Sequence, residues 1–204
     1  MSFYKVAVVV VRMVCRLIYR FKVEGIENIP KDRPFIVCAN HKSLMDPILL
    51  AVSIPVEFRF MAKEELFKNK LVGWFLRALG AFPVKRGTSD IGALKLSMKI
   101  LGDGGRLIVF PEGTRSPKDH MGEAKGGATL VAIKSQADIL PVGVKGEYGL
   151  FSKLTVRIGE PVSLEQWYGQ KVNSETLLEI TNTKIMKVIS ELSEVPVYED
   201  RDSE

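Results

Sequence analysis

Short apolar runs alternate with helical patterns through most of this chain of 204 residues, and this alternation constrains the fold more than any other feature. The strand-like runs are residues 35–39, 58–62, 80–84, 106–110, 139–144 and 154–158. The helical patterns are residues 47–53, 64–79, 89–101, 126–135 and 174–192. Strands that alternate with helices are typical of a sheet covered by helices. The sequence therefore predicts an α/β fold, with a mixed, mostly parallel sheet flanked by helices.

The length and composition of the chain suit one such domain. It is long enough for a substantial core, and its 46% of apolar and 26% of charged residues are ordinary for a globular protein. It contains no internal repeat, linker-like segment or low-complexity segment. We therefore expect two parts, an N-terminal helix over residues 1–24 and a single α/β domain over residues 25–204.

The positive charge of the chain is concentrated at its N-terminus. The net charge is +5, and five of the 29 basic residues precede the first acidic residue, Glu24, which leaves 24 basic and 24 acidic residues in the rest. At about 100° per residue, four of the five fall in one helical stripe about 80° wide, surrounded by apolar side chains. These four are Lys5, Arg12, Arg16 and Arg20. The pattern predicts an amphipathic helix on an anionic phospholipid membrane surface, although a packed helix with a solvated basic edge would show the same stripe.

Several other classes of structure and partner are not expected. The longest run without a charged residue has ten residues, 47–56, whereas a membrane-spanning helix needs about 20. Arg12 and Arg16 interrupt the N-terminal apolar stretch, which argues against a signal peptide. Cys15 and Cys38 lack the spacing of a metal site, and the aromatic residues are too few to suggest a base-stacking surface. We therefore expect no metal, no disulfide framework and no nucleic-acid partner.

One of the two histidines, His41, stands five positions before Asp46, directly after the run 35–39. Side chains five residues apart on a helix point about 140° apart, so this pair cannot meet on one regular helix. They can meet if His41 lies in a loop and Asp46 begins the next helix, as Pro47 favours. Asp46 would then accept the Nδ1 proton of His41, and the other ring nitrogen would take a proton from a hydroxyl group. The spacing alone is weak evidence, because Asp46 could instead cap the helix and His41 bond to the backbone.

A turn with a glycine follows the run 106–110, in the sequence Phe-Pro-Glu-Gly-Thr-Arg-Ser over residues 110–116. Gly113 permits a turn whose backbone amides can bind an anion. Arg115 can bind phosphate oxygens through two hydrogen bonds, and Thr114 adds a hydroxyl donor. Glu112 can orient an arginine or a substrate hydroxyl. Taken alone, the segment also fits a β-turn with a solvated arginine, and it is not a nucleotide-binding P-loop.

Two further basic residues stand at the ends of strand-like runs. Lys63 follows the run 58–62, and Arg86 follows the run 80–84. Ligands of open α/β sheets gather outside the carboxyl ends of the strands, so both positions suit a phosphate site, although each alone is typical of a surface charge. No Gly-x-Ser-x-Gly segment provides a nucleophile. Direct attack by a hydroxyl group of the substrate is therefore the simpler chemistry.

Taken together, these segments resemble the glycerolipid acyltransferases of the 1-acyl-sn-glycerol-3-phosphate acyltransferase family. Residues 40–46 match the His-x4-Asp motif of that family, and residues 110–116 match its glycerophosphate-binding motif throughout. Two looser motifs are similar to residues 80–86 and 140–142. The order and spacing of the four motifs agree with the family, whereas Lys85 stands where many relatives have an acidic residue.

The resemblance implies a 1-acylglycerol-3-phosphate O-acyltransferase of phospholipid biosynthesis. His41 would deprotonate the sn-2 hydroxyl of lysophosphatidic acid, the oxygen would attack an acyl thioester, and Asp46 would support the imidazolium. The acceptor phosphate would be held by the basic residues Arg86, Arg115 and Lys63. The acceptor site would be shaped by the turn residues Glu112, Gly113 and Thr114. No cofactor is implied, because the acyl carrier protein or coenzyme A thioester is a co-substrate.

The resemblance also implies a peripheral, monotopic location on the cytoplasmic face of the cell membrane, because acceptor and product reside in a bilayer and the thioester carrier is cytosolic. Within the same class, the acceptor could be glycerol 3-phosphate or another lysophospholipid. From other classes, the chain could be a thioesterase in which His41 activates water, or a non-catalytic phospholipid-binding module. A phosphate site argues against the first, and an intact His–Asp pair argues against the second. The acyl chain length, the choice of donor and the oligomeric state are not defined by the sequence.

Overall fold

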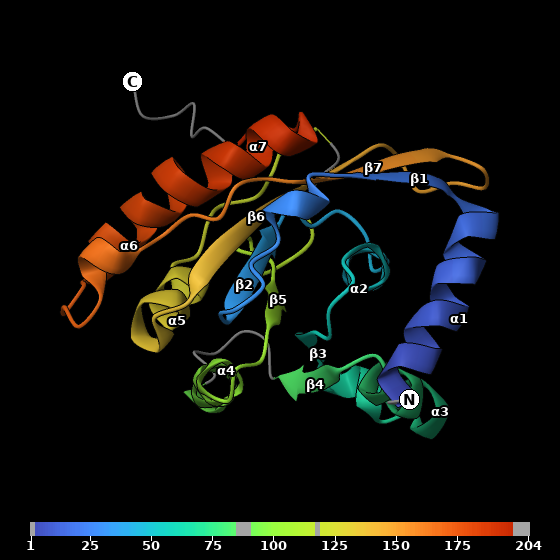
Figure 1. Ribbon diagram of the computed structural model, residues 1–204, viewed down its shortest axis with the longest axis horizontal. Helices are drawn as coiled ribbons and strands as arrows, with labels where there is room; N and C mark the ends of the chain where they lie inside the picture. The colour runs from blue at the N-terminus through green and yellow to red at the C-terminus, as the bar shows by residue number, and fades with distance from the viewer. Residues whose placement is uncertain (1–2, 85–90, 117–118, 198–204) are drawn as a thin grey trace.

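The computed structural model describes residues 3–84, 91–116 and 119–197. Within these ranges, seven strands form one sheet in the order β1-β7-β6-β2-β5-β3-β4 (Figure 1). The strands are β1 (Arg20–Glu24), β2 (Phe35–Ala39), β3 (Arg59–Lys63), β4 (Ala81–Val84), β5 (Leu107–Val109), β6 (Asp138–Lys145) and β7 (Lys153–Ile158).

The sheet is mixed but mostly parallel, as predicted. Strands β6, β2, β5, β3 and β4 are neighbours in that order and all run in one direction. In the middle of the sheet, Val37 lies opposite Ile108 on one side and Leu140 on the other. Strand β7 is antiparallel to β6, and β1 pairs with β7 in parallel. The reversal therefore lies near one edge, and the carboxyl ends of five parallel strands meet at a common edge of the sheet.

Helices connect and cover the strands. They are α1 (Phe3–Ile18), α2 (Asp46–Ser53), α3 (Lys70–Ala78), α4 (Ile91–Gly102), α5 (Gly127–Ser135), α6 (Ser174–Ile180) and α7 (Lys187–Ser193). A π-helical segment, Thr181–Met186, joins α6 to α7, so the helix predicted over 174–192 is one continuous element. The predicted helix over 64–79 is divided: a 3₁₀ turn, Glu64–Phe67, precedes α3, whose N-cap residue Asn69 accepts two backbone hydrogen bonds.

Two cores lie on the two faces of the sheet, and alternate residues of β2 enter each. Phe35 and Val37 belong to the core beneath α1 and α2, whereas Ile36 and Cys38 belong to the core beneath α4, α5, α6 and α7. Figure 1 shows these two groups of helices on opposite sides of the central strands. Because both faces of a parallel sheet are covered in this way, its central strands read as continuous apolar runs, and all five residues of β2 are buried.

The N-terminal helix is shorter than predicted. It ends at Ile18, and Arg20 begins strand β1, where its backbone N–H donates to Ser152 O at 2.8 Å. Arg20 is therefore not part of the helical stripe that the sequence predicted. The alternation of polar and apolar residues in Arg20–Glu24 suits an edge strand, and its partner, β7, comes more than a hundred residues later in the chain.

Arg12 also differs from the prediction, because its side chain is half-buried and bound to the fold. Its Nε donates to Val52 O at 2.7 Å, near the C-terminus of α2, where a cation is favoured by the helix dipole. Lys5 and Arg16 remain exposed. The basic residues of α1 thus lie between its packed face, which includes Tyr4, Val8 and Cys15, and its outer face.

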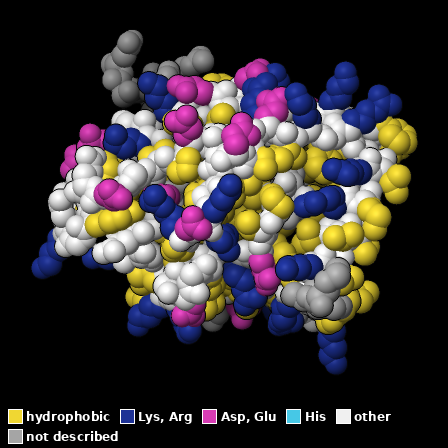
Figure 2. All heavy atoms as spheres, viewed as in Figure 1, with side chains coloured by type: hydrophobic (Ala, Val, Ile, Leu, Met, Phe, Trp, Pro, Cys, Tyr) yellow, Lys and Arg dark blue, Asp and Glu magenta, His cyan; other side chains and the backbone are white. Residues whose placement is uncertain are grey.

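The outer face of α1 is apolar. Six large apolar side chains on it are 43–74% exposed, namely Val6, Val9, Val10, Met13, Val14 and Leu17. The neighbouring helix α3 adds Leu71, 75% exposed, and Trp74, 56% exposed. Figure 2 shows apolar side chains and basic side chains gathered together on the side of the molecule where α1 lies. In the described ranges, no helix is long and apolar enough to cross a membrane.

Candidate active site

The predicted site residues come together at the carboxyl edge of the parallel strands. His41 follows β2, the turn 110–116 follows β5, and Lys63 is the last residue of β3. Lys63 is exposed and forms an ion pair with Glu65 at 3.2 Å. Arg86, predicted to follow β4, lies outside the described residues. The topology therefore groups the described residues at one edge, as the order of strands and helices predicted.

His41 and Asp46 meet through a loop-to-helix turn, as helical geometry required. Strand β2 ends at Ala39, α2 begins at Asp46, and His41 Nδ1 lies 2.9 Å from Asp46 Oδ2. The imidazole stacks on the ring of Phe110, with ring centres 4.0 Å apart. With a carboxylate facing Nδ1, the proton belongs on Nδ1, and the lone pair lies on Nε2. Among the described residues, Nε2 has no hydrogen-bond partner, so it is available to a substrate hydroxyl.

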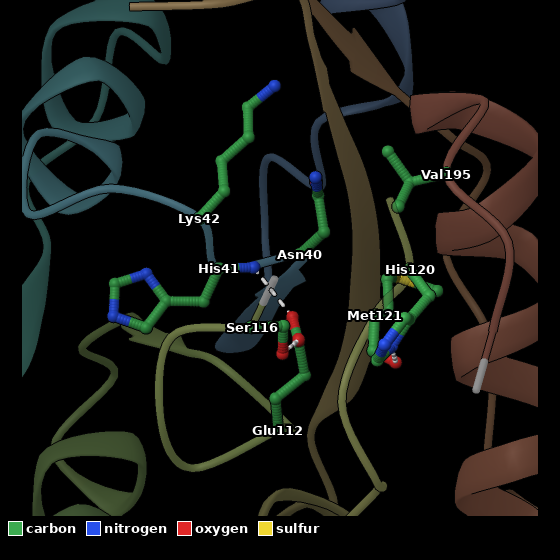
Figure 3. A pocket seen from close by; sticks show the side chains of 8 residues that line it. All are labelled: Asn40, His41, Lys42, Glu112, Ser116, His120, Met121 and Val195. Carbon is green, nitrogen blue, oxygen red and sulfur yellow. Dashed lines mark hydrogen bonds between the residues drawn. The ribbon is translucent and has the colours of Figure 1, made fainter. Parts of the chain in front are cut away.

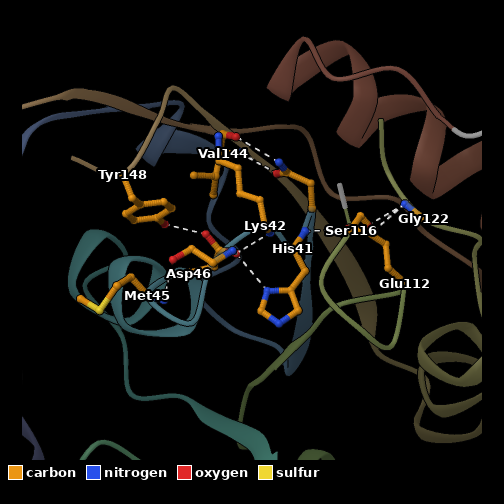
Figure 4. Close-up of polar contacts among 11 residues, drawn as sticks. His41, Lys42, Met45, Asp46, Glu112, Ser116, Gly122, Val144 and Tyr148 are labelled. Carbon is orange, nitrogen blue, oxygen red and sulfur yellow. Dashed lines mark hydrogen bonds and ion pairs between the residues drawn. The ribbon is translucent and has the colours of Figure 1, made fainter. Parts of the chain in front are cut away.

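Asp46 is fully buried and accepts four hydrogen bonds (Figure 4). Besides His41, the backbone N–H groups of Lys42 and Ser43 donate to Oδ2 at 2.8 and 2.7 Å, and the hydroxyl of Tyr148 donates to Oδ1 at 2.6 Å. The N-cap of α2 is Met45, so Asp46 does not cap the helix. Four donors compensate the buried negative charge. Asp46 thus organises the loop that carries His41.

Asn40 fixes the start of this loop. Its side-chain amide donates to Val144 O at 3.0 Å and its Oδ1 accepts from Val144 N at 2.8 Å. The backbone pairing of β2 with β6 ends at Ala39, which lies opposite Val142. The two hydrogen bonds between the Asn40 side chain and Val144 extend this pairing beyond the end of β2. A side chain therefore replaces the backbone at the point where β2 turns out of the sheet, and His41 is held at a defined exit from the strand.

The carboxylate of Glu112 forms its hydrogen bonds with neighbouring parts of the chain. It is buried, and its Oε1 accepts from the backbone N–H of His41 at 2.6 Å. Its Oε2 accepts from the backbone N–H of Gly122 at 2.7 Å and from the hydroxyl of Ser116. The reason is local: the N–H of His41 has left the sheet ladder and needs an acceptor. Glu112 therefore fixes the loop of His41 through its backbone.

A small cavity lies on the Glu112 side of the loop (Figure 3). Glu112, Ser116, His120 and Met121 line it, and Figure 3 shows the imidazole of His41 turned away from it. The Nδ1 of His120 and the carbonyl of Met121, its neighbour, are 3.0 Å apart. The cavity is therefore a space behind the loop rather than the place where the imidazole would meet a substrate.

The turn 110–116 lies beside His41. Gly113 has φ = 71°, a conformation that favours glycine, and the N–H of Ser116 donates to His41 O at 2.9 Å. Thr114 and Arg115 are exposed on this turn, immediately before Ser116. The prediction that the turn adjoins the His–Asp pair is confirmed, with Arg115 available at its surface.

Other reactive groups of the described chain are packed away. Cys38 is fully buried in β2, and burial raises the pKa of its thiol. Within residues 3–84, 91–116 and 119–197, no three His, Cys, Asp or Glu side chains are grouped as a metal site requires. The residues that the sequence did not reveal are Asn40, as a strand mimic, and Tyr148, as a partner of Asp46. Neither carries a local pattern, because each acts across about a hundred residues of chain.

Comparison with known proteins agrees with this geometry. A model of the acyltransferase family matches residues 20–145, more than half of the chain. The chain is 34% identical over 165 residues to the 1-acyl-sn-glycerol-3-phosphate acyltransferase of Bacillus subtilis, covering 78% of this chain and 82% of that protein. It is 35% identical over 164 residues to the enzyme of the same name from Streptococcus pneumoniae, covering 76% of this chain and 60% of that protein.

A solved structure is also similar. The crystal structure of the 1-acyl-sn-glycerophosphate acyltransferase PlsC from Thermotoga maritima matches with a TM-score of 0.71 and 33% identity, over 93% of this chain and 80% of that one. The likeness therefore extends over nearly the whole described fold, beyond the motifs alone. The chain belongs to the 1-acyl-sn-glycerol-3-phosphate acyltransferase family.

Proposed function

We propose that this chain transfers an acyl group from an acyl thioester to the sn-2 hydroxyl of lysophosphatidic acid, which gives phosphatidic acid. The observation that carries the proposal is the buried pair of His41 Nδ1 and Asp46 Oδ2, 2.9 Å apart, at the carboxyl edge of the sheet. The family relatives bear the name of this activity. Within the described residues, we identify no side chain beside His41 that would be a better nucleophile than the substrate hydroxyl.

In the proposed reaction, Nε2 of His41 takes the proton of the sn-2 hydroxyl as the oxygen attacks the thioester carbonyl. Asp46 stabilises the imidazolium that forms, and its four hydrogen bonds keep it in place while it does so. The tetrahedral intermediate then collapses, the carbon–sulfur bond breaks, and the thiolate takes the proton back from Nε2. The products are phosphatidic acid and the free thiol of the carrier protein or coenzyme A.

The acceptor phosphate is proposed to bind beside His41. Arg115 supports this because it is exposed on the turn that donates a hydrogen bond to His41 O. Lys63 lies at the same edge, at the end of β3, and Arg86 completes the proposed set from the segment after β4. Gly113 and Thr114 shape the surface of the turn. Glu112 contributes indirectly, because its carboxylate fixes the backbone between the turn and His41.

The membrane surface is the proposed partner of α1, and we propose a peripheral enzyme on the cytoplasmic face of the cell membrane. The outer face of α1 exposes large apolar side chains, and Lys5 and Arg16 are exposed on the same helix. Apolar side chains enter the boundary of the acyl chains, and basic side chains bind anionic headgroups. Such an orientation would bring a bilayer substrate to a site that a soluble thioester can also reach.

Replacement of His41 tests the proposed chemistry. Loss of a general base lowers the rate about 10²- to 10⁴-fold, so His41→Ala is expected to lower the rate of acyl transfer by that factor, and circular dichroism checks that the variant is still folded. His120→Ala, which removes the other histidine, is the matched control and is expected to retain activity. A folded His41→Ala protein with full acyl transfer would refute the base assignment.

Product analysis tests the substrate. Lysophosphatidic acid and glycerol 3-phosphate are each offered with an acyl carrier protein thioester and with a coenzyme A thioester. Phosphatidic acid formed from lysophosphatidic acid is the expected product. Transfer to glycerol 3-phosphate alone would move the activity to another acceptor. Release of free fatty acid at the same rate without any acceptor would identify a thioesterase instead.

A further inference from the structure

Tyr148 reaches the catalytic pair from a distant part of the chain. It lies in the loop between β6 and β7, 102 residues after Asp46, and its hydroxyl donates to Asp46 Oδ1 at 2.6 Å. Figure 4 shows Tyr148 and His41 approaching Asp46 from opposite sides. Because His41 and two backbone N–H groups all donate to Oδ2, Tyr148 is the donor that faces the other carboxylate oxygen. The two oxygens are therefore divided between the imidazole side and the phenol side.

The surroundings fix Tyr148 as a hydrogen-bond donor. Asp46 is fully buried, so Oδ1 without a donor would be a buried, unsatisfied charge-bearing atom. Burial, together with the negative charge of Asp46, raises the pKa of Tyr148 above its ordinary value of 10.0. The phenol therefore stays protonated over the whole range in which an acyltransferase is assayed, and the direction of the hydrogen bond does not change.

The loop that carries Tyr148 is tied to the N-terminal part of the fold. Within the loop that joins β6 to β7, Phe151 N donates to Ile18 O at 2.7 Å, and Ser152 O accepts from Arg20 N at 2.8 Å. The ring of Tyr148 also packs edge-on against Tyr19, with ring centres 5.6 Å apart. These contacts place Tyr148 against the junction of α1 and β1, so its position does not depend on the substrate.

We propose that Tyr148 is a positioning residue of the acyl-transfer reaction, which orients the Asp46 carboxylate toward His41 and shares its negative charge. This inference rests on the proposed function. With the hydroxyl in place, Asp46 keeps Oδ2 in line with Nδ1 of His41. Tyr148 acts through Asp46 and does not touch the reacting atoms.

Tyr148→Phe is the direct test, because it removes one oxygen and keeps the ring that packs on Tyr19. Loss of a hydrogen bond to a charged group is expected to lower kcat about 10- to 100-fold. The KM for lysophosphatidic acid is expected to change less than about twofold, because no contact with the acceptor is lost. Tyr19→Phe is the matched control: it removes a phenol hydroxyl from the same ring pair, and its kcat is expected to equal that of the parent protein.

The pH dependence separates positioning from packing. Without the phenol, the carboxylate is no longer fixed in line with Nδ1, which lowers kcat. Its undivided charge also holds a proton on the free imidazole, so the acid limb of kcat/KM is expected to move to higher pH. The ionisable groups that act on Tyr148 besides Asp46 are Tyr19 and Cys15. Near the loop of His41, Lys42 Nζ donates to Gly146 O and Glu112 accepts from the backbone N–H of His41. Proton NMR of the two histidine rings gives a second measurement, in which the ring signals of His41 are expected to change in Tyr148→Phe and those of His120 are expected to stay in place.

A double-mutant comparison decides whether Tyr148 acts through Asp46. Asp46→Asn and the double variant Asp46→Asn/Tyr148→Phe are expected to have the same residual kcat, because the second change removes a function that the first has already lost. If the two losses multiply, or if Tyr148→Phe leaves both kcat and the pH profile unchanged in a folded protein, the proposal is overturned. An active His41→Ala protein would instead overturn the proposed function, so the two failures are distinct.

Discussion

Two buried carboxylates at the active site have opposite relations to His41. Asp46 bonds to the imidazole of His41, whereas Glu112 bonds to its backbone N–H on the other side of the chain. Asp46 also accepts hydrogen bonds from three further backbone or hydroxyl groups, and Glu112 from two. The loop of His41 is thus held between two carboxylates, one bonded to its imidazole and one bonded to its backbone.

Glu112→Gln is predicted to weaken the fold and the activity together. Glu112 accepts hydrogen bonds from three groups, namely His41 N, Gly122 N and the Ser116 hydroxyl. A glutamine has one oxygen and an NH₂ group in place of the two oxygens, so at least one of these donors loses its acceptor. The expected cost is about 1–3 kcal/mol of unfolding free energy, or a melting temperature lower by about 2–12 °C. Thermal unfolding and the acyl-transfer assay measure both effects. Glu123→Gln, at an exposed position nearby, is the control, and equal behaviour of the two variants would contradict the assigned role.

Local residue patterns allowed the His41–Asp46 pair to be predicted, whereas the residues that support it were not predictable from the sequence. His41 and Asp46 are five residues apart, so helical geometry and Pro47 were sufficient to predict that the two side chains meet through a loop-to-helix turn. Tyr148 and Asn40 act through partners about a hundred residues away, which no spacing in one sequence indicates. The bonds of Glu112 to backbone N–H groups were also not predictable, because the sequence does not show that the N–H of His41 lacks a partner in the sheet.

At the scale of elements, the alternation of strand-like and helical segments predicted the parallel part of the sheet. It did not predict β1, the strand at one edge of the sheet. Strands β2 and β6 are buried on both faces and read as apolar runs. Strand β1 is half-exposed and follows α1 after one residue, so its residues were assigned to the helix. The sequence therefore placed Arg20 in the basic helical stripe, whereas it belongs to the edge strand β1.

The contact between α7 and β6 is predicted to tolerate no side chain at Gly143. A Cβ there would come within 2.4 Å of backbone atoms of Leu192 and Ser193, which cannot move without shifting the helix. Gly143→Ala is expected to cost about 1–3 kcal/mol and to lower the melting temperature by about 2–12 °C. Gly127→Ala is the control, since a Cβ there meets open space at the start of α5. A Gly143→Ala protein as stable as the control would show that α7 is not packed this closely.

At the scale of the whole molecule, helix α1 contacts the elements that carry Asp46 and Tyr148. Helix α1 packs on α2, whose first residue is Asp46. The loop of Tyr148 is bonded to Ile18, the last residue of α1. An enzyme seated on a bilayer through α1 would therefore hold its His–Asp pair at a fixed distance from the surface.

Vesicle binding tests this arrangement. Replacement of Val10, Met13 and Leu17 by glutamine is expected to lower the bound fraction on neutral and anionic vesicles, by about tenfold or more in the binding constant. Neutralisation of Lys5 and Arg16 is expected to weaken binding to anionic vesicles only, and less at high salt. Leu178→Gln, at an exposed apolar position on α6, is the control. Sedimentation that is unchanged in the first variant would remove α1 from the proposed membrane contact.

The pairing of β1 with β7 also sets an order of events during synthesis. Arg20 pairs with Lys153, 133 residues later, and a ribosome that adds about 5–20 residues per second needs roughly 7–27 s to make that interval. During this time β1 has no partner strand, because β7 has not yet been made. The loop that carries Tyr148 is made just before β7. Helix α1 therefore leaves the ribosome before the sheet can close and before Tyr148 can reach Asp46.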